Sequence, residues 1–415
     1  MSNRIEVEEK YFVQDIQKLE SHIKSQEFKL VSCYNETDEY FTDIDSIYVK
    51  NRTCLRLRNS NNNLELTFKG KSNEFLNSYA KIEKNIELKT EQYDDIVDML
   101  KKLGYYSYVF VNKNRKTYTK NIDELAYNVM IDNIENVGSF VEFEILAENF
   151  NYSLKELKKK LEEFTFKFKY LSLKVANLPY RDFVSYNIFS KIKPKNKLTT
   201  VLCDLDGTLI NSESIFFEAF KEILNEKFNI EISFYEYEEN ELNKNSNLIN
   251  KLKLENKIPN NILEEDIMNE VYNRYLNRFK ELIKDDDVYL NFELLKRIKN
   301  KGIKIGLIST SKREFINLIL QDLKLDNLFD IIVSREDVIN LKPSPEAYIK
   351  AINSLRINTD ECIAVEDSYR GIEASTNANI KTIKVSEYSK QNQNIKNAIS
   401  IDKISRLLLI LINNI

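Results

Sequence analysis

The sequence predicts a multidomain protein. The N-terminal half is expected to form an eight-stranded antiparallel β tunnel with flanking helices (α+β), and the C-terminal half an α/β parallel sheet with an inserted helical cap. Two patterns predict this division. In the first half, charged residues recur two or four positions apart between apolar ones, which places them on one face of a β-strand. In the second half, short apolar runs alternate with amphipathic helical segments, which is typical of a parallel sheet covered on both faces.

The spaced charges occur in six segments of the N-terminal half. For any single strand, a solvated outer face would explain them. Six strands that gather both acids and bases indicate instead that the charges point into a shared, hydrated cavity, while helices cover the apolar exterior. The sets are Glu6–Glu8–Lys10, Arg56–Arg58, Glu65–Lys69, Glu83–Glu87, Lys113–Arg115 and Glu142–Glu144.

The elements of this half follow from the same periodicities, apart from residues 171–190, which carry no clear pattern. A basic, proline-containing stretch at 191–198 predicts a linker between a first domain, 1–190, and a second, 199–415. Helices are expected at about 14–25, 92–103 and 153–165. Strands are expected at about 4–13, 28–42, 53–60, 64–70, 80–89, 108–119, 125–132 and 139–146.

The strands of the second half are predicted from apolar runs such as 199–203, 303–308, 331–333 and 362–365. Between the first two runs lies a largely helical insert at about 214–287, which is the expected cap. Short apolar strands separated by long helical segments are the pattern of a parallel sheet.

Composition excludes several classes of protein. The chain of 415 residues is 42% hydrophobic and 30% charged, which is typical of a folded globular protein. Its net charge of -4 gives no general attraction to nucleic acid. The longest apolar run, 407–412, is too short to cross a bilayer, and the N-terminus lacks the apolar core of a secretory signal. The four cysteines are scattered without metal-ligand spacing, so a cytoplasmic protein without membrane or nucleic-acid partners is expected.

Histidine usage limits the chemistry. His22 is the only histidine in the sequence, which argues against His-based metal sites and against Ser–His or Cys–His nucleophile pairs. Catalysis must therefore use carboxylates, lysine, arginine and a bound metal.

A pair of aspartates marks a candidate site in the second half. Asp204 and Asp206 directly follow the apolar run 201–203, and ligands bind at the carboxyl ends of parallel strands. Two carboxylates at this spacing can divide the work of phosphoryl transfer: one attacks phosphorus, and the other handles the leaving-group proton. Alone, the pair is a weak signal, because aspartate also caps helices and turns.

Three further strand ends carry matching groups. Ser309 follows one apolar run, Lys342 precedes a helix, and Glu366–Asp367 end another run. Taken singly, Ser309 and Asp367 could be helix caps and Lys342 a surface charge. Together with Asp204 they predict a site that grips a phosphoryl group and holds Mg²⁺ through oxygen ligands alone.

These motifs resemble those of the haloacid dehalogenase-like (HAD) hydrolase superfamily with a helical C1 cap after the first motif, over about 199–415. The resemblance implies a Rossmann-like sheet, Asp204 as the nucleophile that forms an aspartyl-phosphate, and Asp206 as general acid and base. Ser309 and Lys342 would steady the phosphoryl group. Mg²⁺ would be bound by Asp204, the backbone carbonyl of Asp206, and Asp367, with Glu366 assisting.

Two residues bear on the reaction within that superfamily. Its dehalogenases lack the second aspartate, so Asp206 argues for phosphate chemistry. Phosphoglycolate-type phosphatases and β-phosphoglucomutases look closest, and the mutases carry a histidine where this chain has Phe216. That departure favours hydrolysis of a small phosphomonoester, and a sugar phosphomutase is the alternative.

The first half is similar to the CYTH domain of the triphosphate tunnel metalloenzymes. The ExExK signature appears as Glu6–Lys10, and the charged segments up to Glu144 continue the match in order over about 1–185. The resemblance implies that several cations bind a triphosphate while acids hold Mg²⁺ or Mn²⁺ on it. The implied triphosphate-binding residues are Lys10, Arg56, Arg58, Lys69, Lys113 and Arg115. The implied metal ligands are Glu6, Glu8, Asp132, Glu142 and Glu144.

Two positions depart from the CYTH pattern. Lys81 stands where arginine is common, and Asn85 interrupts the acidic run 83–87, which leaves the number of tunnel metals open. The leading hypothesis is a bifunctional, metal-dependent phosphohydrolase acting on small phosphorylated metabolites. The N-terminal domain could instead be a class IV-type adenylyl cyclase or a triphosphate sensor. Many tunnel enzymes of this family pair up, which makes a homodimer one assembly to consider.

Overall fold

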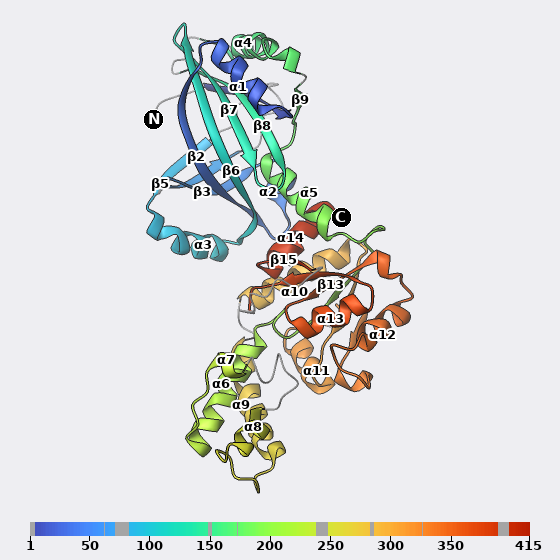
Figure 1. The fold of residues 1–415 in the computed structure, drawn as a ribbon. Coiled ribbons are helices and arrows are strands. Elements are labelled where there is room, and N and C mark those ends of the chain that lie inside the picture. Colours follow the sequence, from blue (N-terminus) through green and yellow to red (C-terminus); the bar gives the residue numbers. More distant parts are fainter. Residues whose placement is uncertain are drawn as a thin grey trace. The chain divides into compact units, whose positions relative to one another are not determined.

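The computed structural model describes most of the chain in two compact units, residues 1–189 and 190–413 (Figure 1). The described residues are 5–61, 63–70, 83–147, 152–171, 173–237, 248–282, 286–325, 327–388 and 398–415.

The described part of the first unit is built on an antiparallel sheet of nine strands, in the order β5-β4-β3-β2-β6-β7-β8-β1-β9. The predicted antiparallel tunnel is confirmed, and a short ninth strand, β9, comes from the segment without a clear pattern. Figure 1 shows β2 and β6 as long, curved strands. The bounds are β1 (Ile5–Val13), β2 (Lys29–Asp43), β3 (Cys54–Ser60), β4 (Asn63–Lys69), β5 (Glu83–Leu88), β6 (Tyr105–Ile122), β7 (Leu125–Ile134), β8 (Gly138–Ala147) and β9 (Lys174–Val175).

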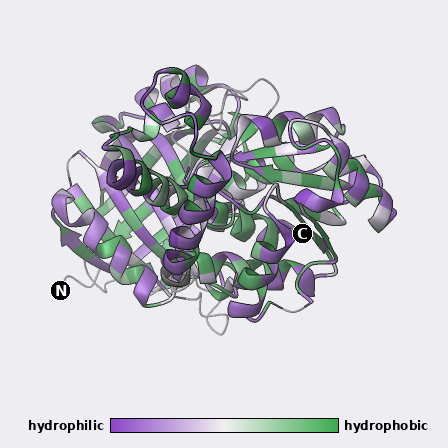
Figure 2. Ribbon diagram, turned by 90° about the horizontal axis from the view of Figure 1, so that it is seen from below, coloured by the Kyte–Doolittle hydropathy of each residue, from purple (hydrophilic) through white to green (hydrophobic). Residues whose placement is uncertain are grey.

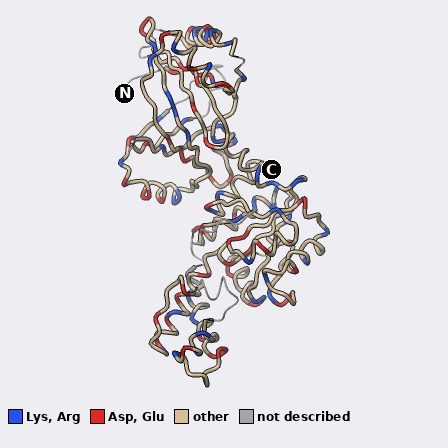
Figure 3. Tube along the Cα trace, viewed as in Figure 1, with Lys and Arg blue, Asp and Glu red and all other residues tan. Residues whose placement is uncertain are grey.

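The alternation along β1 and β8 separates an apolar outer face from a polar inner one. Val7 and Phe143 are buried in a cluster with residues of α1 (Ile16–Ser25) and α4 (Leu154–Phe166). The acids between these apolar positions therefore point the other way, into the tunnel. Hydrophilic and hydrophobic residues are interspersed along the strands drawn in Figure 2, and in Figure 3 both basic and acidic residues lie on the strands of the first unit.

The remaining helices of this unit cover other parts of the sheet. Helix α3 (Tyr93–Lys102) packs Leu100 against an apolar cluster from β2, β3 and β4. Two more helices are α2 (Ile47–Lys50) and α5 (Tyr180–Ile192).

The described part of the second unit is built on six parallel strands, in the order β12-β11-β10-β13-β14-β15. The predicted α/β, Rossmann-like sheet is confirmed. Helices α12 and α13 bury one face in a cluster that includes Leu202, Ile308 and Ala364, while α10 packs against β11. The strands are β10 (Thr200–Cys203), β11 (Lys304–Ile308), β12 (Ile331–Val333), β13 (Cys362–Glu366), β14 (Lys381–Val385) and β15 (Ile399–Ile401).

The insert between β10 and β11 is helical in its described residues. Helices α6 and α9 pack along each other, and Arg274 of α9 forms ion pairs with Glu222 and Glu226 of α6. The helices of this unit are α6 (Ser212–Phe228), α7 (Phe234–Tyr237), α8 (Leu248–Leu254), α9 (Glu264–Leu282), α10 (Asp286–Asn300), α11 (Arg313–Asp322), α12 (Glu346–Leu355), α13 (Tyr369–Asn377) and α14 (Ile404–Asn414). Among all the described helices, none combines the length and apolar character that a bilayer span requires.

Close packing of the parallel sheet should make Gly306 of β11 intolerant of a side chain. A Cβ atom at this position would lie 2.6 Å from Cδ2 of the fully buried Leu202. We expect Gly306→Ala to destabilise the second unit by about 1–3 kcal/mol. Pulse proteolysis in urea measures this loss of stability, because the fragments from the two units can be followed separately on a gel. Leu202→Val removes the opposing atom, so the double variant should cost less than the sum of the two single changes. Additive costs would contradict the predicted clash.

Candidate active sites

The predicted acids of the second unit meet at the carboxyl ends of two neighbouring strands. Asp204 follows β10, Glu366 ends β13, and Asp367 comes next; β10 and β13 pair in parallel. The backbone N–H of Asp204 donates to the carbonyl of Val365 at 3.0 Å, which fixes the two strand ends together. All three acids are buried, and each offers a carboxylate oxygen within 4.8 Å of the others.

Lys342 is the cation at the centre of this cluster. Its ammonium lies 2.6 Å from Asp204 Oδ1, 2.6 Å from Glu366 Oε1 and 2.8 Å from the carbonyl of Ile308. One ammonium cannot balance three carboxylates. Burial, followed by repulsion from neighbouring acids, raises the pKa of Asp204 and of Asp367 well above the usual range, although Lys342 opposes this. A further positive charge would therefore stabilise the ionised form of these carboxylates.

The carboxylate oxygens of this cluster are suitable ligands for a divalent metal ion. Glu366 Oε2 is buried and makes no hydrogen bond to any of the described residues. A hard cation such as Mg²⁺ takes carboxylate oxygens as ligands and would compensate the charge. Asp204, Glu366 and Asp367, which all belong to the predicted ligand set, are the residues whose oxygens lie close enough together to hold it.

Asp206 lies beside this cluster, where it is fixed by three serine hydroxyls. Its Oδ1 accepts from Ser212 at 2.5 Å, and its Oδ2 accepts from Ser311 at 2.6 Å and from Ser309 at 3.2 Å. Ser309 was predicted as a residue that steadies the phosphoryl group, and its contact with Asp206 was not predicted; Ser212 and Ser311 were missed. Their sequence signal is weak: Ser311 stands two positions after Ser309, and Ser212 opens α6.

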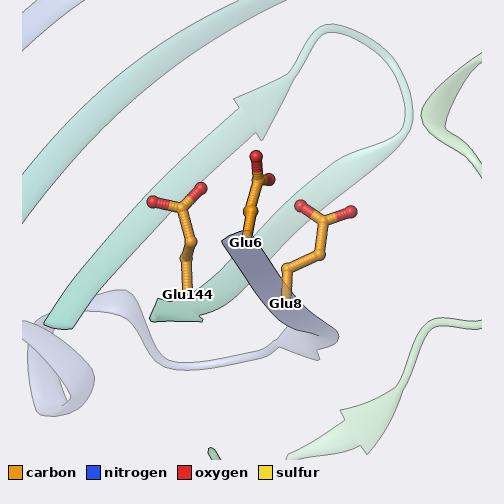
Figure 4. Close-up of side chains that lie close together, drawn as sticks. All are labelled: Glu6, Glu8 and Glu144. Carbon is orange, nitrogen blue, oxygen red and sulfur yellow. The ribbon is translucent and has the colours of Figure 1, made fainter. Parts of the chain in front are cut away.

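In the tunnel of the first unit, three predicted metal ligands come together. Glu8 of β1 is in register with Glu144 of β8, and together with Glu6 they offer oxygens within 4.8 Å of one another. Figure 4 shows the three side chains extending in the same direction. Enclosure by the tunnel wall, followed by repulsion from Glu142 and Glu6, raises the pKa of Glu8 to about 7, although water still reaches the side chain. A bound cation would relieve this repulsion.

The other two predicted acids, Asp132 and Glu142, form a separate group around Arg115. The guanidinium donates to Asp132 Oδ1 at 2.6 Å and Oδ2 at 2.5 Å, and to Glu142 Oε2 at 2.6 Å. Lys10 lies 3.6 Å from Glu142 Oε1. Although burial opposes it, attraction to Arg115 and to the lysines Lys10 and Lys113 lowers the pKa of Glu142. The structure thus divides the five predicted acids into a trio and an arginine-bound pair.

Arg56, Arg58 and Lys113 pair with two acids of β2 that the sequence analysis missed, Glu36 and Asp38. Arg58 grips Asp38 through two hydrogen bonds, of 2.6 and 2.9 Å, and Lys113 lies 2.8 Å from Glu36. Arg56 lies 3.7 Å from Asp38. The signal was present, because the two acids stand two positions apart in the run that becomes β2. The lumen therefore holds more negative charge than the sequence analysis counted.

Comparison with known proteins identifies both halves. A model of haloacid dehalogenase-like hydrolases matches residues 201–385, and a model of the CYTH domain matches residues 4–176. A pyrophosphatase PpaX from Bacillus cereus is 32% identical over 221 residues, which make up 52% of this chain and 98% of that protein. The chain is a CYTH domain fused to a HAD-like hydrolase.

Solved structures match the chain in part. A putative β-phosphoglucomutase from Thermotoga maritima is 22% identical, covers 52% of this chain and 100% of its own, and has a TM-score of 0.42. A putative adenylate cyclase from Vibrio parahaemolyticus is 19% identical, covers 43% of this chain and 97% of its own, and has a TM-score of 0.36.

Three further positions of the CYTH domain are Lys69, Asn85 and Lys81. Lys69 ends β4 and lowers the pKa of Glu8 by its charge, which places it toward the lumen. Asn85 lies in β5 opposite Thr67 of β4. Lys81 lies outside the described residues.

Two glycines leave room for the acids of the HAD domain. Gly207 has a positive φ of 78°, and a Cβ atom there would lie 2.3 Å from Asp367 Oδ2. A Cβ atom at Gly371 would lie 1.9 Å from Glu366 Oε2. Any larger residue at either position would displace a proposed metal ligand.

Gly371→Ala is therefore expected to disable the HAD site. Displacing the Glu366 carboxylate also disturbs Lys342, and a shift of about 1 Å in such a group can cost about 100-fold in rate. Mg²⁺-dependent phosphate release and Mg²⁺ titration calorimetry should both show the loss. Asn377→Ala is the control, since this residue is exposed on the same helix, α13. Wild-type activity in Gly371→Ala would contradict the tight fit.

Proposed function

We propose that the chain is a bifunctional, metal-dependent phosphohydrolase of small phosphorylated metabolites. The HAD domain would hydrolyse a small phosphomonoester or inorganic pyrophosphate through an aspartyl-phosphate, and the CYTH domain would hydrolyse a triphosphate-containing compound. The observation that carries the first activity is the buried cluster of Asp204, Lys342, Glu366 and Asp367. Pyrophosphate is the first substrate to test, because the relative from Bacillus cereus is named a pyrophosphatase.

In the HAD domain, Asp204 is the proposed nucleophile. Its Oδ1 is bound to Lys342, so the other carboxylate oxygen is available to attack phosphorus. As the new O–P bond forms and the bond to the leaving oxygen breaks, protonated Asp206 gives its proton to the leaving oxygen. Water then attacks the aspartyl-phosphate, Asp206 accepts a proton from it, and phosphate leaves.

The surrounding groups stabilise charge during these steps. The hydroxyl groups of Ser309 and Ser311 hold Asp206 in place, and Lys342 offsets the negative charge that gathers at Asp204. Mg²⁺ held by Asp204, the Asp206 carbonyl and Asp367, with Glu366 assisting, would supply electrostatic stabilisation of the phosphoryl oxygens.

In the CYTH domain, charge matching supports triphosphate binding. Lys10, Lys69, the two arginines of β3, and Lys113 and Arg115 of β6 line the lumen, and the trio of Glu6, Glu8 and Glu144 could hold Mg²⁺ or Mn²⁺. Catalysis would consist mainly of positioning the phosphate chain and stabilising its charge while water attacks the terminal phosphorus.

Asp204→Asn separates the two proposed activities. Loss of the nucleophile should lower pyrophosphate hydrolysis at least about 1,000-fold while leaving tripolyphosphate turnover unchanged. Phosphorus NMR of the products measures both in one sample, since the variant should convert tripolyphosphate to pyrophosphate and phosphate and then stop. If this one change abolishes both reactions, the two-site proposal is wrong. Cyclic AMP formed from ATP would identify the CYTH domain as a cyclase instead.

Metal removal and Glu144→Gln test the trio of the CYTH domain. Chelation should stop both reactions, and added Mg²⁺ should restore them. Glu144→Gln keeps the shape of the side chain and removes one negative charge. We expect it to raise the Mg²⁺ concentration needed for tripolyphosphate turnover about tenfold or more, while the Mg²⁺ dependence of pyrophosphate hydrolysis stays unchanged. Equal shifts in both dependences would rule out a separate tunnel site.

A further inference from the structure

A tyrosine that no sequence pattern singled out reaches into the charged lumen of the CYTH domain. Tyr180 opens α5, so it comes from a helix rather than from a strand of the sheet, and its side chain is buried. Its ring packs edge-on against Phe140, with centroids 5.0 Å apart. Phe183, also on α5, packs against Phe140 and Phe12. These contacts fix the start of α5 against β1 and β8.

The face of this ring meets two of the lysines expected to bind triphosphate. Lys10 Nζ lies 3.9 Å from the ring centroid and Lys113 Nζ lies 5.5 Å from it. The negative face of an aromatic ring attracts an ammonium group, and the attraction is stronger where water is largely excluded. Tyr180 therefore helps to place Lys10 in the lumen.

Lys10 differs from three of the lumen cations, Arg58, Arg115 and Lys113, in what holds it. Arg58, Arg115 and Lys113 each have a carboxylate oxygen at 2.5–2.8 Å. Lys10 has Glu142 at the longer distance of 3.6 Å, together with the ring of Tyr180. A carboxylate neutralises an ammonium, whereas a ring attracts it without carrying a charge. Lys10 is therefore less tightly paired with an acid than those three cations are, and its positive charge is more available to an incoming anion.

The hydroxyl group fixes the ring in this position. It donates to Asp132 Oδ2 at 2.8 Å, and Asp132 is fully buried and bound to Arg115. Burial, together with the nearby acids Glu142 and Asp132, raises the pKa of Tyr180 well above its usual value, so the hydroxyl remains a donor. Tyr180, Asp132, Arg115, Glu142 and Lys10 form a closed ring of contacts, and Tyr180 is the member supplied by α5.

We propose that Tyr180 is a positioning residue of the triphosphate site: its ring holds the ammonium of Lys10 in the lumen without neutralising it, while its hydroxyl anchors the ring to Asp132. This inference rests on the proposed function of the CYTH domain. It adds a residue whose role is to preserve the charge of a phosphate-binding lysine.

The test compares two substitutions of Tyr180 in the full chain carrying Asp204→Asn, so that only tripolyphosphate cleavage is followed. Tyr180→Leu removes ring and hydroxyl, and we expect KM for Mg²⁺-tripolyphosphate to rise about tenfold with a smaller change in kcat. Tyr180→Phe keeps the ring, so its KM should stay within about threefold of the parent value. Titration calorimetry with Mg²⁺-tripolyphosphate gives the same ratios as dissociation constants.

Phe183→Leu is the matched control, because it loosens the same helix without touching a lumen charge. Its KM should equal that of the parent even if its melting temperature falls as far as that of Tyr180→Leu. Equal KM values for Tyr180→Leu and Phe183→Leu would overturn the proposal and leave Tyr180 a structural anchor. If the parent chain neither cleaves nor binds tripolyphosphate, the proposed function of the CYTH domain is wrong, and the role of Tyr180 falls with it.

Discussion

The compensation of enclosed negative charge governs both sites of this protein. Carboxylates withdrawn from water repel one another and are tolerated only where cations or hydrogen-bond donors face them. In the HAD domain, Lys342 bridges Asp204 and Glu366 and leaves a negative excess that suits a divalent metal. In the CYTH domain, Arg58 and Arg115 compensate Asp38 and Asp132, while the trio around Glu8 retains its mutual repulsion. In each domain, three acids of this kind place carboxylate oxygens close enough together to hold one metal ion.

The two domains reach this arrangement by different structural routes. The HAD domain places its charged groups just beyond parallel strands, so neighbouring strands such as β10 and β13 bring distant residues together at one edge. The CYTH domain places its groups along the strands, where alternation sends every second side chain inward. The first arrangement needs close backbone approach, which Gly207 and Gly371 permit. The second depends on the pairing register, which sets Glu8 opposite Glu144.

Uncharged hydroxyl and aromatic groups position charged side chains in both sites. Three serines fix Asp206, the proposed acid and base, through uncharged donors. Tyr180 acts on Lys10 in a comparable way, by holding a charged group without cancelling its charge. Such neutral contacts orient a reactive or binding group and leave its charge available for the substrate.

The amino-acid sequence by itself determined the two folds, the eight predicted tunnel strands and the order of the site motifs, because periodicity and strand-end position are local properties of a chain. Only the tertiary structure decided which side chains pair with one another. Lys342 could have been a surface charge, yet it is buried against Asp204, 138 positions away in the sequence. Glu36 and Asp38 carried the two-residue spacing but no sign of their partners, Tyr180 carried no signal, and the five predicted tunnel acids divide into two groups. Such pairings depend on strand register and helix docking, which bring distant residues together and leave no local pattern.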